Sequence, residues 1–198
     1  MLEARELACL RGERAVFAGV SFRVEPGAAL LLTGANGAGK SSLLRLVAGL
    51  LRPAAGALLW DGGDALADRA EHARRLRYLS PQDALKPALT ARESLLFAAR
   101  LHGGGGDVDA ALDALGLLPL AELPVRLLST GQRRRLALAR LDLAPAPLWL
   151  LDEPTLGLDA ASVSRLGDLL ARHREGGGAV VAATHLPLPL PGAAELRL

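Results

Sequence analysis

The segment Gly34–Ser41 has the residue types and the spacing of a loop that binds phosphate groups. It follows the pattern G-x-x-x-x-G-K-S, in which glycines let backbone N–H groups converge on phosphate oxygens at the start of a helix. Lys40 would then contact the β- and γ-phosphates, and the Ser41 hydroxyl would bind Mg²⁺. A glycine-rich turn between a strand and a helix is the alternative. The predicted nucleotide-binding residues are Gly34, Asn36, Gly37, Ala38, Gly39, Lys40, Ser41 and Ser42.

Two adjacent acids, Asp152 and Glu153, follow the apolar run Leu148–Leu151. Such a run predicts a buried strand, and carboxylates buried at its end are costly unless a cation or hydrogen-bond donors meet them. Asp152 has the position of an acid that anchors Mg²⁺. Glu153 has that of a general base, or of a residue that positions an attacking water. A solvated strand end that leads into a turn is the alternative.

Lysine, asparagine and glutamine are rare in this chain, so the positions where they occur are informative. Lys40 and Lys86 are the only lysines among the 23 basic residues, and Asn36, Gln82 and Gln132 are the only side-chain amides. We expect such residues where Arg or Ala could not do the same chemistry. All of them except Lys86 fall in the motifs of this section.

The overall composition narrows the class of protein. With 198 residues, 51% of them hydrophobic, the chain is large enough for one domain with its own core. A net charge of +2 is too small to indicate a nucleic-acid partner, and the lone Cys9 excludes a disulfide framework. The apolar runs fall short of the roughly 18 residues that a membrane span needs, and the first residues lack a signal-peptide pattern. We therefore expect a cytoplasmic chain.

Hydrophobic periodicity predicts an α/β fold, with strands first and a helix-rich segment later. Strands are predicted at residues 2–8, 14–24, 28–33, 57–60, 76–80, 148–151 and 179–183. Helices are predicted at residues 40–50, 91–102, 108–116, about 131–144 and about 160–173. We expect a single domain over residues 1–198, with 1–82 and 146–198 as its core and about 83–145 as a helical lobe.

The segment Leu128–Gln132 reads LSTGQ and lies where a helix is predicted to begin. Taken alone, this segment is explained as the start of a helix that Ser or Thr caps. Together with the phosphate loop and the acid pair, it makes the chain resemble ABC-type ATPases, whose signature is usually LSGGQ, over almost its full length. The resemblance implies a P-loop NTPase fold of ABC type, with a mixed core sheet, an N-terminal antiparallel β part and a small α-helical lobe.

In that family the signature of one subunit closes over the ATP that the phosphate loop of another subunit holds. The resemblance therefore implies a homodimer in the ATP-bound state, with Asp159 at the dimer interface. A hydroxyl and a glycine at a helix N-terminus also form an anion site on general grounds. The residues that would act in trans are Ser129, Thr130, Gly131 and Gln132.

Two more segments complete the family pattern. Tyr78–Gln82 occupies the place of the Q-loop, so the resemblance implies that Gln82 contacts Mg²⁺ or water. Ala182–His185 matches the switch segment, so His185 would contact the γ-phosphate. The predicted catalytic residues are Glu153, His185 and Gln82, and the predicted Mg²⁺ ligands are Ser41, Gln82 and Asp152. Three further histidines lack such a context and are expected at the surface: His72, His102 and His173.

The chain departs from the family pattern on the side of the nucleotide base. The family often has an aromatic residue that stacks on adenine, about nine residues before the segment that is Val20–Ser21 here. That position holds Arg11, whose guanidinium plane could also stack. Phe17 is expected in the core.

Several segments resemble the ATP-binding subunits of cytochrome c maturation (haem export) complexes: Met1–Leu7, Leu50–Trp60, Thr90–Leu95, Leu128–Leu141 and Thr184–Leu188. That resemblance implies an ATP hydrolase that uses ATP and Mg²⁺ and drives integral membrane permease subunits. It also implies a peripheral location on the inner face of the cell membrane. The sequence has no CxxCH segment, so we do not expect this chain to bind haem.

Three other functions are compatible with parts of this pattern. The chain could be the ATPase subunit of another ABC transporter with a different substrate. It could be a non-transport ABC protein that acts on DNA or ribosomes, but such proteins carry a long coiled coil or two cassettes. It could be a regulatory nucleotide-binding module without turnover, which Glu153 and His185 argue against.

Overall fold

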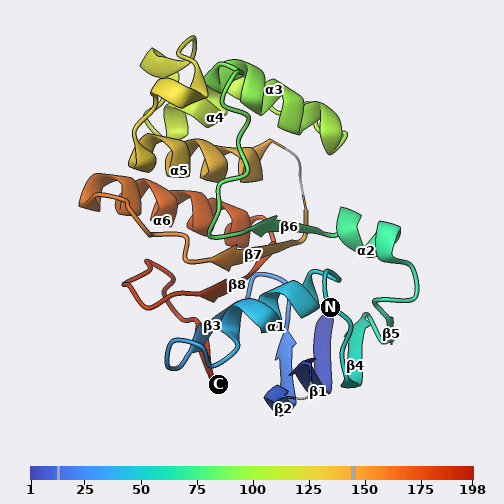
Figure 1. The fold of residues 1–198 in the computed structure, drawn as a ribbon. Coiled ribbons are helices and arrows are strands. Elements are labelled where there is room, and N and C mark those ends of the chain that lie inside the picture. The colour runs from blue at the N-terminus through green and yellow to red at the C-terminus, as the bar shows by residue number, and fades with distance from the viewer. Residues whose placement is uncertain (13, 144–145) are drawn as a thin grey trace.

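The computed structural model describes residues 1–12, 14–143 and 146–198, and it contains two β-sheets with helices between and above them (Figure 1). The first sheet, sheet A, is antiparallel and has the strand order β2-β1-β4-β5. Its strands are β1 (Leu2–Arg11), β2 (Arg14–Val24), β4 (Ala55–Trp60) and β5 (Gly63–Asp64).

The second sheet, sheet B, is parallel and has the order β6-β7-β8-β3-β9. Its strands are β3 (Ala29–Thr33), β6 (Leu76–Leu79), β7 (Leu148–Asp152), β8 (Ala179–Ala183) and β9 (Ala194–Arg197). Because all of them run in one direction, their carboxyl ends share one edge of the sheet, where α/β proteins bind ligands. The predicted N-terminal antiparallel part is sheet A, and the core sheet that was predicted to be mixed is the separate, parallel sheet B.

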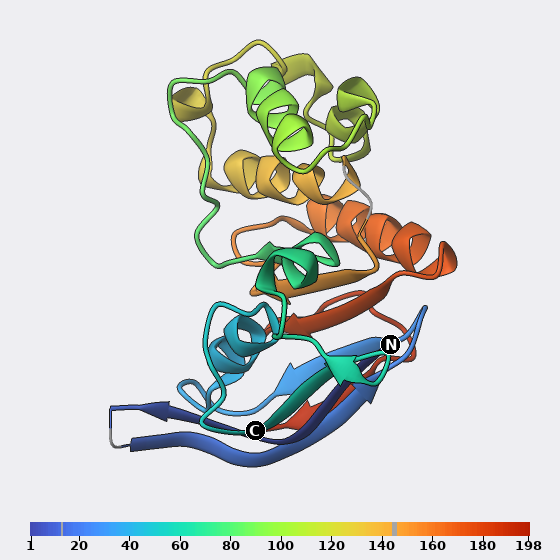
Figure 2. The same ribbon diagram turned by 90° about the vertical axis from the view of Figure 1, so that its right-hand side faces the viewer.

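The helices flank both faces of sheet B. They are α1 (Lys40–Val47), α2 (Arg69–Arg74), α3 (Ala91–Leu101), α4 (Val108–Ala114), α5 (Thr130–Ala139) and α6 (Ala160–Glu175), with the short 3₁₀ helices η1 (Leu118–Leu120), η2 (Val125–Leu127) and η3 (Arg140–Asp142). Helix α1 lies between the two sheets, and α5 and α6 cover the opposite face of sheet B (Figure 1). Helices α3 and α4 lie beyond α5, at the end of the molecule farthest from sheet A (Figure 2).

Strand β7 shows why an interior strand of sheet B carries a continuous apolar run. Successive side chains of a strand point to opposite faces, and Leu148 and Leu150 belong to a core shared with α1 and sheet A. Trp149 and Leu151 belong to the core under α5 and α6. The continuous hydrophobic run that predicted this strand is therefore the result of burial on both sides.

Some elements differ from the sequence prediction. The helix expected over about 131–144 is α5 followed by η3, which ends at Asp142, and Ala144 lies outside the described residues. Strands β5 and β9 and helix α2 were not predicted, since elements of two, four and six residues are too short to show a period. The division into a core and a helical lobe stays a prediction.

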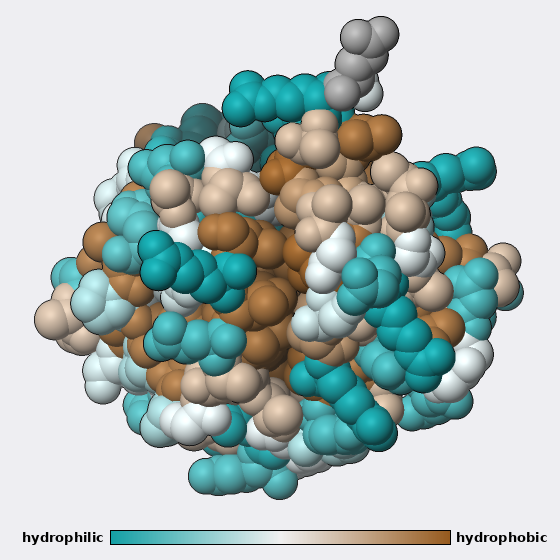
Figure 3. Space-filling model, turned by 90° about the horizontal axis from the view of Figure 1, so that it is seen from below, coloured by the Kyte–Doolittle hydropathy of each residue, from teal (hydrophilic) through white to brown (hydrophobic). Residues whose placement is uncertain are grey.

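Sheet A faces α1 with one side and leaves the other side open. Seen from below, hydrophilic side chains surround a smaller hydrophobic area in the middle of this end of the molecule (Figure 3). None of the helices in the described residues is both long and apolar enough to cross a bilayer.

Candidate active site

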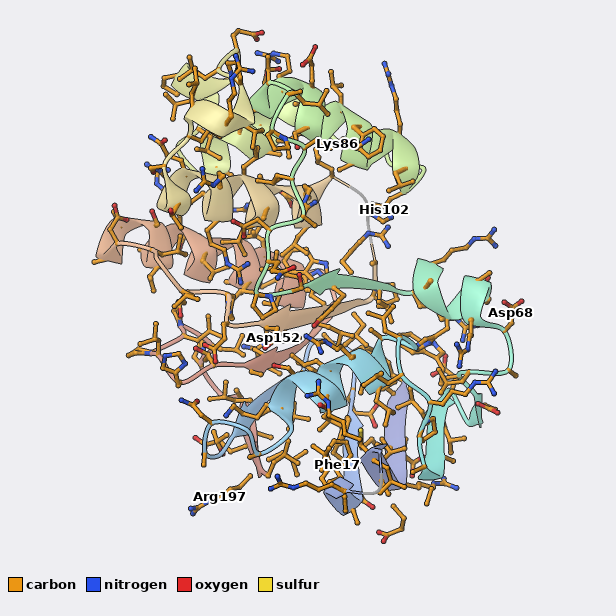
Figure 4. The ribbon with its side chains drawn as sticks, in the orientation of Figure 1. Phe17, Asp68, Lys86, His102, Asp152 and Arg197 are labelled. Carbon is orange, nitrogen blue, oxygen red and sulfur yellow. The ribbon has the colours of Figure 1, made fainter. Side chains whose placement is uncertain are left out.

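The predicted phosphate loop connects the end of β3 to the start of α1. Gly39 immediately precedes α1 and has φ of +104°, a region that favours glycine. A Cβ at this position would lie 2.7 Å from Val16 Cγ1 and 2.9 Å from Phe17 Cδ1. Only glycine fits here, because β2 packs directly against the loop. Phe17, labelled in Figure 4, packs partly buried against the core, as expected.

Lys40 is buried, and its ammonium group is held at the loop itself. Nζ donates hydrogen bonds to the carbonyl oxygens of Gly34 at 2.7 Å and Ala35 at 3.0 Å. These acceptors are neutral, so a phosphate oxygen would offer the ammonium a stronger, charge-assisted partner. The geometry fits the predicted role of Lys40 at the phosphates.

Asp152 ends β7, is 1% exposed and lies in the interior near α1 (Figure 4). Ser41 Oγ donates to its Oδ1 at 3.0 Å, and the Tyr78 hydroxyl donates to its Oδ2 at 3.3 Å. Burial raises the pKa of Asp152, and the neighbouring charge of Glu153 adds to this rise, whereas the two hydroxyl donors oppose it. The site therefore holds a carboxylate with incomplete compensation of its charge.

The oxygen atoms of Ser41 and Asp152 are the kind of ligand that Mg²⁺ prefers. Within the described residues there is no cluster of three or more His, Cys, Asp or Glu side chains that could hold a metal. Mg²⁺ is commonly bound by one or two protein groups together with substrate phosphates and water. The pair of Ser41 and Asp152 fits that mode and does not fit an all-protein metal cage.

Glu153 and His185 form a pair beside this centre. Glu153 Oε1 lies 3.0 Å from His185 Nδ1, and the His185 backbone N–H donates to Oε2 at 3.4 Å. The Glu153 N–H donates to Ala183 O at 2.8 Å, so the end of β8 fixes its backbone. Its side chain is 18% exposed and can therefore still meet water. A carboxylate in this position can accept a proton from a water molecule.

A cavity of about 490 Å³ opens at the phosphate loop. The phosphate loop, the start of α1, the β1–β2 hairpin and Glu153 all contribute to its lining, which includes Asn36, Gly37, Gly39, Lys40, Ser41, Ser42, Arg11 and Arg14. The structure thus gathers the phosphate loop, Asp152, Glu153 and His185 at the carboxyl edge of sheet B. Gln82 is not part of this group: it is exposed, and it does not line the cavity.

The signature segment forms the N-terminus of α5 and lies outside the cavity lining. Ser129 Oγ accepts from the Gln132 N–H at 3.2 Å, and Gln132 Oε1 accepts from the Ser129 N–H at 2.8 Å. These two side chains therefore form a capping box, so the segment does cap a helix, as its residue types alone also indicate. A Cβ at Gly131 would lie 2.9 Å from Gly157 O, so the two segments meet closely.

Asp159 is the N-cap residue of α6 and accepts a hydrogen bond from the Ser162 N–H at 2.8 Å. Hydrogen bonding from Ser162 lowers the pKa of Asp159. The side chain is exposed, so it can also meet a partner. Its place at a dimer interface stays a prediction, as do the trans roles of the signature residues.

Arg134, which no motif of the sequence marks, donates more hydrogen bonds near the site than any other described side chain. It is 3% exposed and donates to the carbonyl oxygens of Asp152 at 2.9 Å and Glu153 at 2.7 Å. It also donates to Ser80 O at 2.8 Å and to Asp83 Oδ1 at 3.0 Å. Arg134 thus ties α5 to the end of β7 and to the segment that contains Gln82. Its position in the run Arg133–Arg135 gave no sign of burial.

The three remaining histidines differ in their environments. His102 is exposed, as expected. His72 is buried, with Nε2 at 2.7 Å from Val47 O, so its predicted surface position is wrong. His173 is partly buried, and its ring stacks on Trp149 with centroids 3.7 Å apart. Both serve packing between elements that the sequence does not show to be neighbours.

Comparison with known proteins places this geometry in a family. The family model described as ABC transporter matches residues 17–156. The cytochrome c biogenesis ATP-binding export protein CcmA of Rhodospirillum rubrum is 59% identical over 194 residues, which cover 98% of this chain and 83% of the relative. The protein of the same name from Paramagnetospirillum magneticum is 54% identical over 200 residues, or 98% of this chain and 92% of the relative.

Solved structures agree with the fold. An ATP-binding subunit of an ABC transporter has a TM-score of 0.85 at 26% identity, over 93% of this chain and 79% of that chain. An ATP-binding cassette solved as a dimer in a post-hydrolysis state, bound to ADP and Pi, has a TM-score of 0.83 at 25% identity, over 94% and 88% of the two chains. The predicted fold class is confirmed. The chain belongs to the ABC transporter family and, within it, to the cytochrome c biogenesis ATP-binding export proteins.

Proposed function

We propose that this chain is the ATP-hydrolysing subunit of an ABC-type membrane complex that exports haem for cytochrome c maturation. One observation carries the enzymatic part: the phosphate loop, the buried Asp152 and the Glu153–His185 pair lie together at one edge of sheet B. The relatives at 59% and 54% identity, both named as cytochrome c biogenesis ATP-binding export proteins, support the biological part.

In this proposal the triphosphate of ATP lies on the phosphate loop. Backbone N–H groups of the loop and the start of α1 would contact its oxygens, and Lys40 would exchange its carbonyl partners for the β- and γ-phosphates. Ser41 and Asp152 would hold Mg²⁺, which neutralises charge on these phosphates. The triphosphate compensates the positive charge of the buried Lys40.

Hydrolysis requires a water molecule aligned with the γ-phosphorus. Glu153 would accept one proton of this water as its oxygen bonds to phosphorus. The bond from phosphorus to the β–γ bridging oxygen breaks, and ADP and inorganic phosphate result. His185, 3.0 Å from Glu153, would orient the carboxylate and contact the γ-phosphate. Gln82 would join the Mg²⁺ or the water if its exposed segment moved toward the cavity.

The signature residues belong to a second copy of the chain in this proposal. Ser129, Thr130, Gly131 and Gln132 lie outside the cavity of their own chain, which supports a role in trans. The cassette solved with ADP and Pi is a dimer. The closed homodimer would move permease subunits at the inner face of the cell membrane, where the chain would be peripheral.

Two variants test the enzymatic part. Lys40→Ala is expected to lose ATP binding, because no other described lysine lines the cavity. Glu153→Gln is expected to keep ATP binding but to lower hydrolysis by roughly 10²-fold or more, the usual contribution of a general base. Nucleotide affinity and phosphate release measure these effects. Full activity of Lys40→Ala, or wild-type hydrolysis by Glu153→Gln, would refute the respective assignment.

A pull-down from native membranes tests the biological part. Glu153→Gln with ATP should hold the complex together, and mass spectrometry would identify its partners. Recovery of haem-handling membrane subunits supports haem export. A different permease would refute the haem assignment but keep the motor mechanism. Ribosomal or DNA-associated proteins without a membrane protein would overturn the transport function.

A further inference from the structure

Tyr78 is the only tyrosine of the chain, and it lies beside the buried carboxylate of Asp152. It belongs to β6, which pairs in parallel with β7 so that Tyr78 is level with Leu150. Side chains two residues apart on a strand point to the same face, so Leu150 and Asp152 share one face of sheet B. Tyr78 packs against the same core as Leu150. The neighbouring strand thus brings the phenol ring to Asp152.

The two oxygens of the Asp152 carboxylate have different partners. Ser41 Oγ donates to Oδ1 at 3.0 Å, and the Tyr78 hydroxyl donates to Oδ2 at 3.3 Å. In the part of the chain that the structure describes, no other hydrogen bond reaches either oxygen. One donor lies on α1 and the other on β6, so two separate elements together fix the orientation of this carboxylate.

The two hydroxyl groups differ in their access to the nucleotide. Ser41 lines the cavity at the phosphate loop, whereas Tyr78 stands outside that lining. Oδ1 is therefore the oxygen on the side of the second proposed ligand, and Oδ2 is the oxygen that a residue outside the cavity holds. Hydrogen-bond partners of metal ligands orient those ligands, and their loss often weakens metal binding as much as the loss of a ligand contact does.

We propose that Tyr78 is a positioning residue for Mg²⁺: its hydroxyl holds Oδ2, so that Asp152 presents only Oδ1 toward Ser41 and the metal. A carboxylate held in this way suits Mg²⁺, which demands near-octahedral geometry. It suits Ca²⁺ less, because Ca²⁺ also takes carboxylates through both oxygens. This inference rests on the proposed function, because it takes Ser41 and Asp152 as the Mg²⁺ ligands.

The affinity of the ATP complex for a metal ion tests the inference. Tyr78→Phe removes the hydroxyl and keeps the ring that packs against the core. The full chain with Glu153→Gln should retain ATP unhydrolysed during the titration. Mn²⁺ is the probe, because the same oxygen ligands suit Mg²⁺ and Mn²⁺, and electron paramagnetic resonance measures its binding. Adding Tyr78→Phe should raise the Mn²⁺ dissociation constant by roughly tenfold or more. An unchanged constant would overturn the inference.

Two further measurements separate positioning from general damage to the site. Without a divalent cation, Tyr78→Phe should bind ATP as tightly as the wild type, because Tyr78 does not line the cavity. With Glu153 intact, it should need more Mg²⁺ for half-maximal hydrolysis but reach the wild-type rate at saturating Mg²⁺. Weaker ATP binding without metal, or a rate that saturating Mg²⁺ fails to restore, would contradict a positioning role.

Competition between cations tests the restriction of Asp152 to one oxygen. Mg²⁺ and Ca²⁺ are each titrated against bound Mn²⁺ in the two ATP complexes. In Tyr78→Phe both carboxylate oxygens are free to bind, so Ca²⁺ should compete better relative to Mg²⁺ than it does in the chain with Tyr78. An unchanged ratio of the two competition constants would refute this restriction.

Two control variants make the outcome specific. Ser94→Ala removes a buried hydroxyl of α3, away from the cavity at the phosphate loop, and it should bind Mn²⁺ like the wild type. A loss as large as that of Tyr78→Phe would overturn the inference. Asp152→Asn should lose Mn²⁺ binding. If it bound Mn²⁺ like the wild type, the metal site of the proposed function would itself fail, which differs from a failure of Tyr78 alone.

Discussion

Asp152 combines deep burial with a charge that nearby groups offset only in part. Its carboxylate receives hydrogen bonds from Ser41 and Tyr78, yet burial still raises its pKa. A buried carboxylate of this kind destabilises the folded chain whenever it is ionised. The same property makes the residue a strong attractant for a divalent cation.

The pH dependence of stability tests this account of Asp152. The pKa of Asp152 is higher in the folded chain than in the unfolded chain. Between these two pKa values the folded chain keeps a proton that the unfolded chain loses. The free energy of unfolding therefore falls as the pH rises through this range. Asp152→Asn should therefore raise the melting temperature at neutral pH. The gain should vanish at a pH below the ordinary pKa, where the carboxyl is neutral in both states.

Thermal melts of the two proteins over a pH series measure this difference. The same variant should also lose Mg²⁺-dependent hydrolysis, because the neutral amide is a weaker ligand than a carboxylate. Ser94→Ala on α3, away from the lining of the cavity at the phosphate loop, is a control that should not show the acid-dependent convergence. A variant that is less stable than the wild type at neutral pH would contradict the account.

Glu153 has a backbone φ of +50°, which costs a residue with a Cβ roughly 1–2 kcal/mol. Its N–H bond to Ala183 O holds it in this conformation. Backbone strain of this kind is often found at functional sites, where the surrounding structure enforces it. Here it directs the carboxylate away from the strand and toward His185.

At the scale of elements, Arg134 explains how a helix controls the end of a strand. It lies on α5 and donates to the backbone oxygens of Asp152 and Glu153 at the end of β7. It also donates to Ser80 and Asp83 beyond β6. A displacement of α5 would therefore alter both the Glu153 backbone and the segment of Gln82. This link offers a physical route between the signature segment at the start of α5 and the carboxylate of Glu153, the proposed general base.

Arg134→Ala tests this link. Removing one partner of a buried ion pair typically costs about 3–5 kcal/mol, because the other partner remains buried. Since Asp83 retains some exposure, we expect a loss of about 3 kcal/mol in the free energy of unfolding. Urea denaturation measures it, with Arg100→Ala as the exposed control. If the wild type and Arg134→Ala unfolded with the same free energy, the hydrogen bonds of Arg134 would make no net contribution to stability.

The sequence predicted those elements and site residues that depend on local pattern. The run at residues 148–151 and the glycine spacing of the phosphate loop suffice, because a buried strand and a phosphate loop each leave a short-range signal. Burial of Arg134 and His72 depends on which elements become neighbours, and one chain gives no such information. Strand β9 likewise leaves no recognisable pattern in the sequence, because tertiary contacts decide its pairing with β3.

At the scale of the whole molecule, the phosphate loop and the signature segment at the start of α5 lie in separate regions. Gly131 at the start of α5 approaches Gly157 so closely that a Cβ would lie 2.9 Å from its carbonyl oxygen. The segment that leads to Asp159 therefore rests on the signature segment. Two copies of the chain that closed over ATP would bring both segments to the interface at once.

The dependence of hydrolysis on protein concentration tests dimer formation. If two copies form the active unit, specific activity should rise with concentration and then level off. Gly131→Ala should lower that activity while leaving ATP binding to the separate chain intact, because it displaces only the Gly157 segment. Light scattering of the Glu153→Gln variant with ATP provides an independent measure of mass. Activity that is independent of concentration down to a monomeric solution would exclude the dimer mechanism.

Strand β7 belongs to both hydrophobic cores, with Leu150 in one and Leu151 in the other. Because neither core can loosen without releasing this strand, we expect the two cores to unfold together. Because Asp152 ends β7 and Glu153 follows it, we expect heat inactivation and global unfolding to coincide in temperature. A stabilising substitution in either core thus protects catalysis as well as the fold.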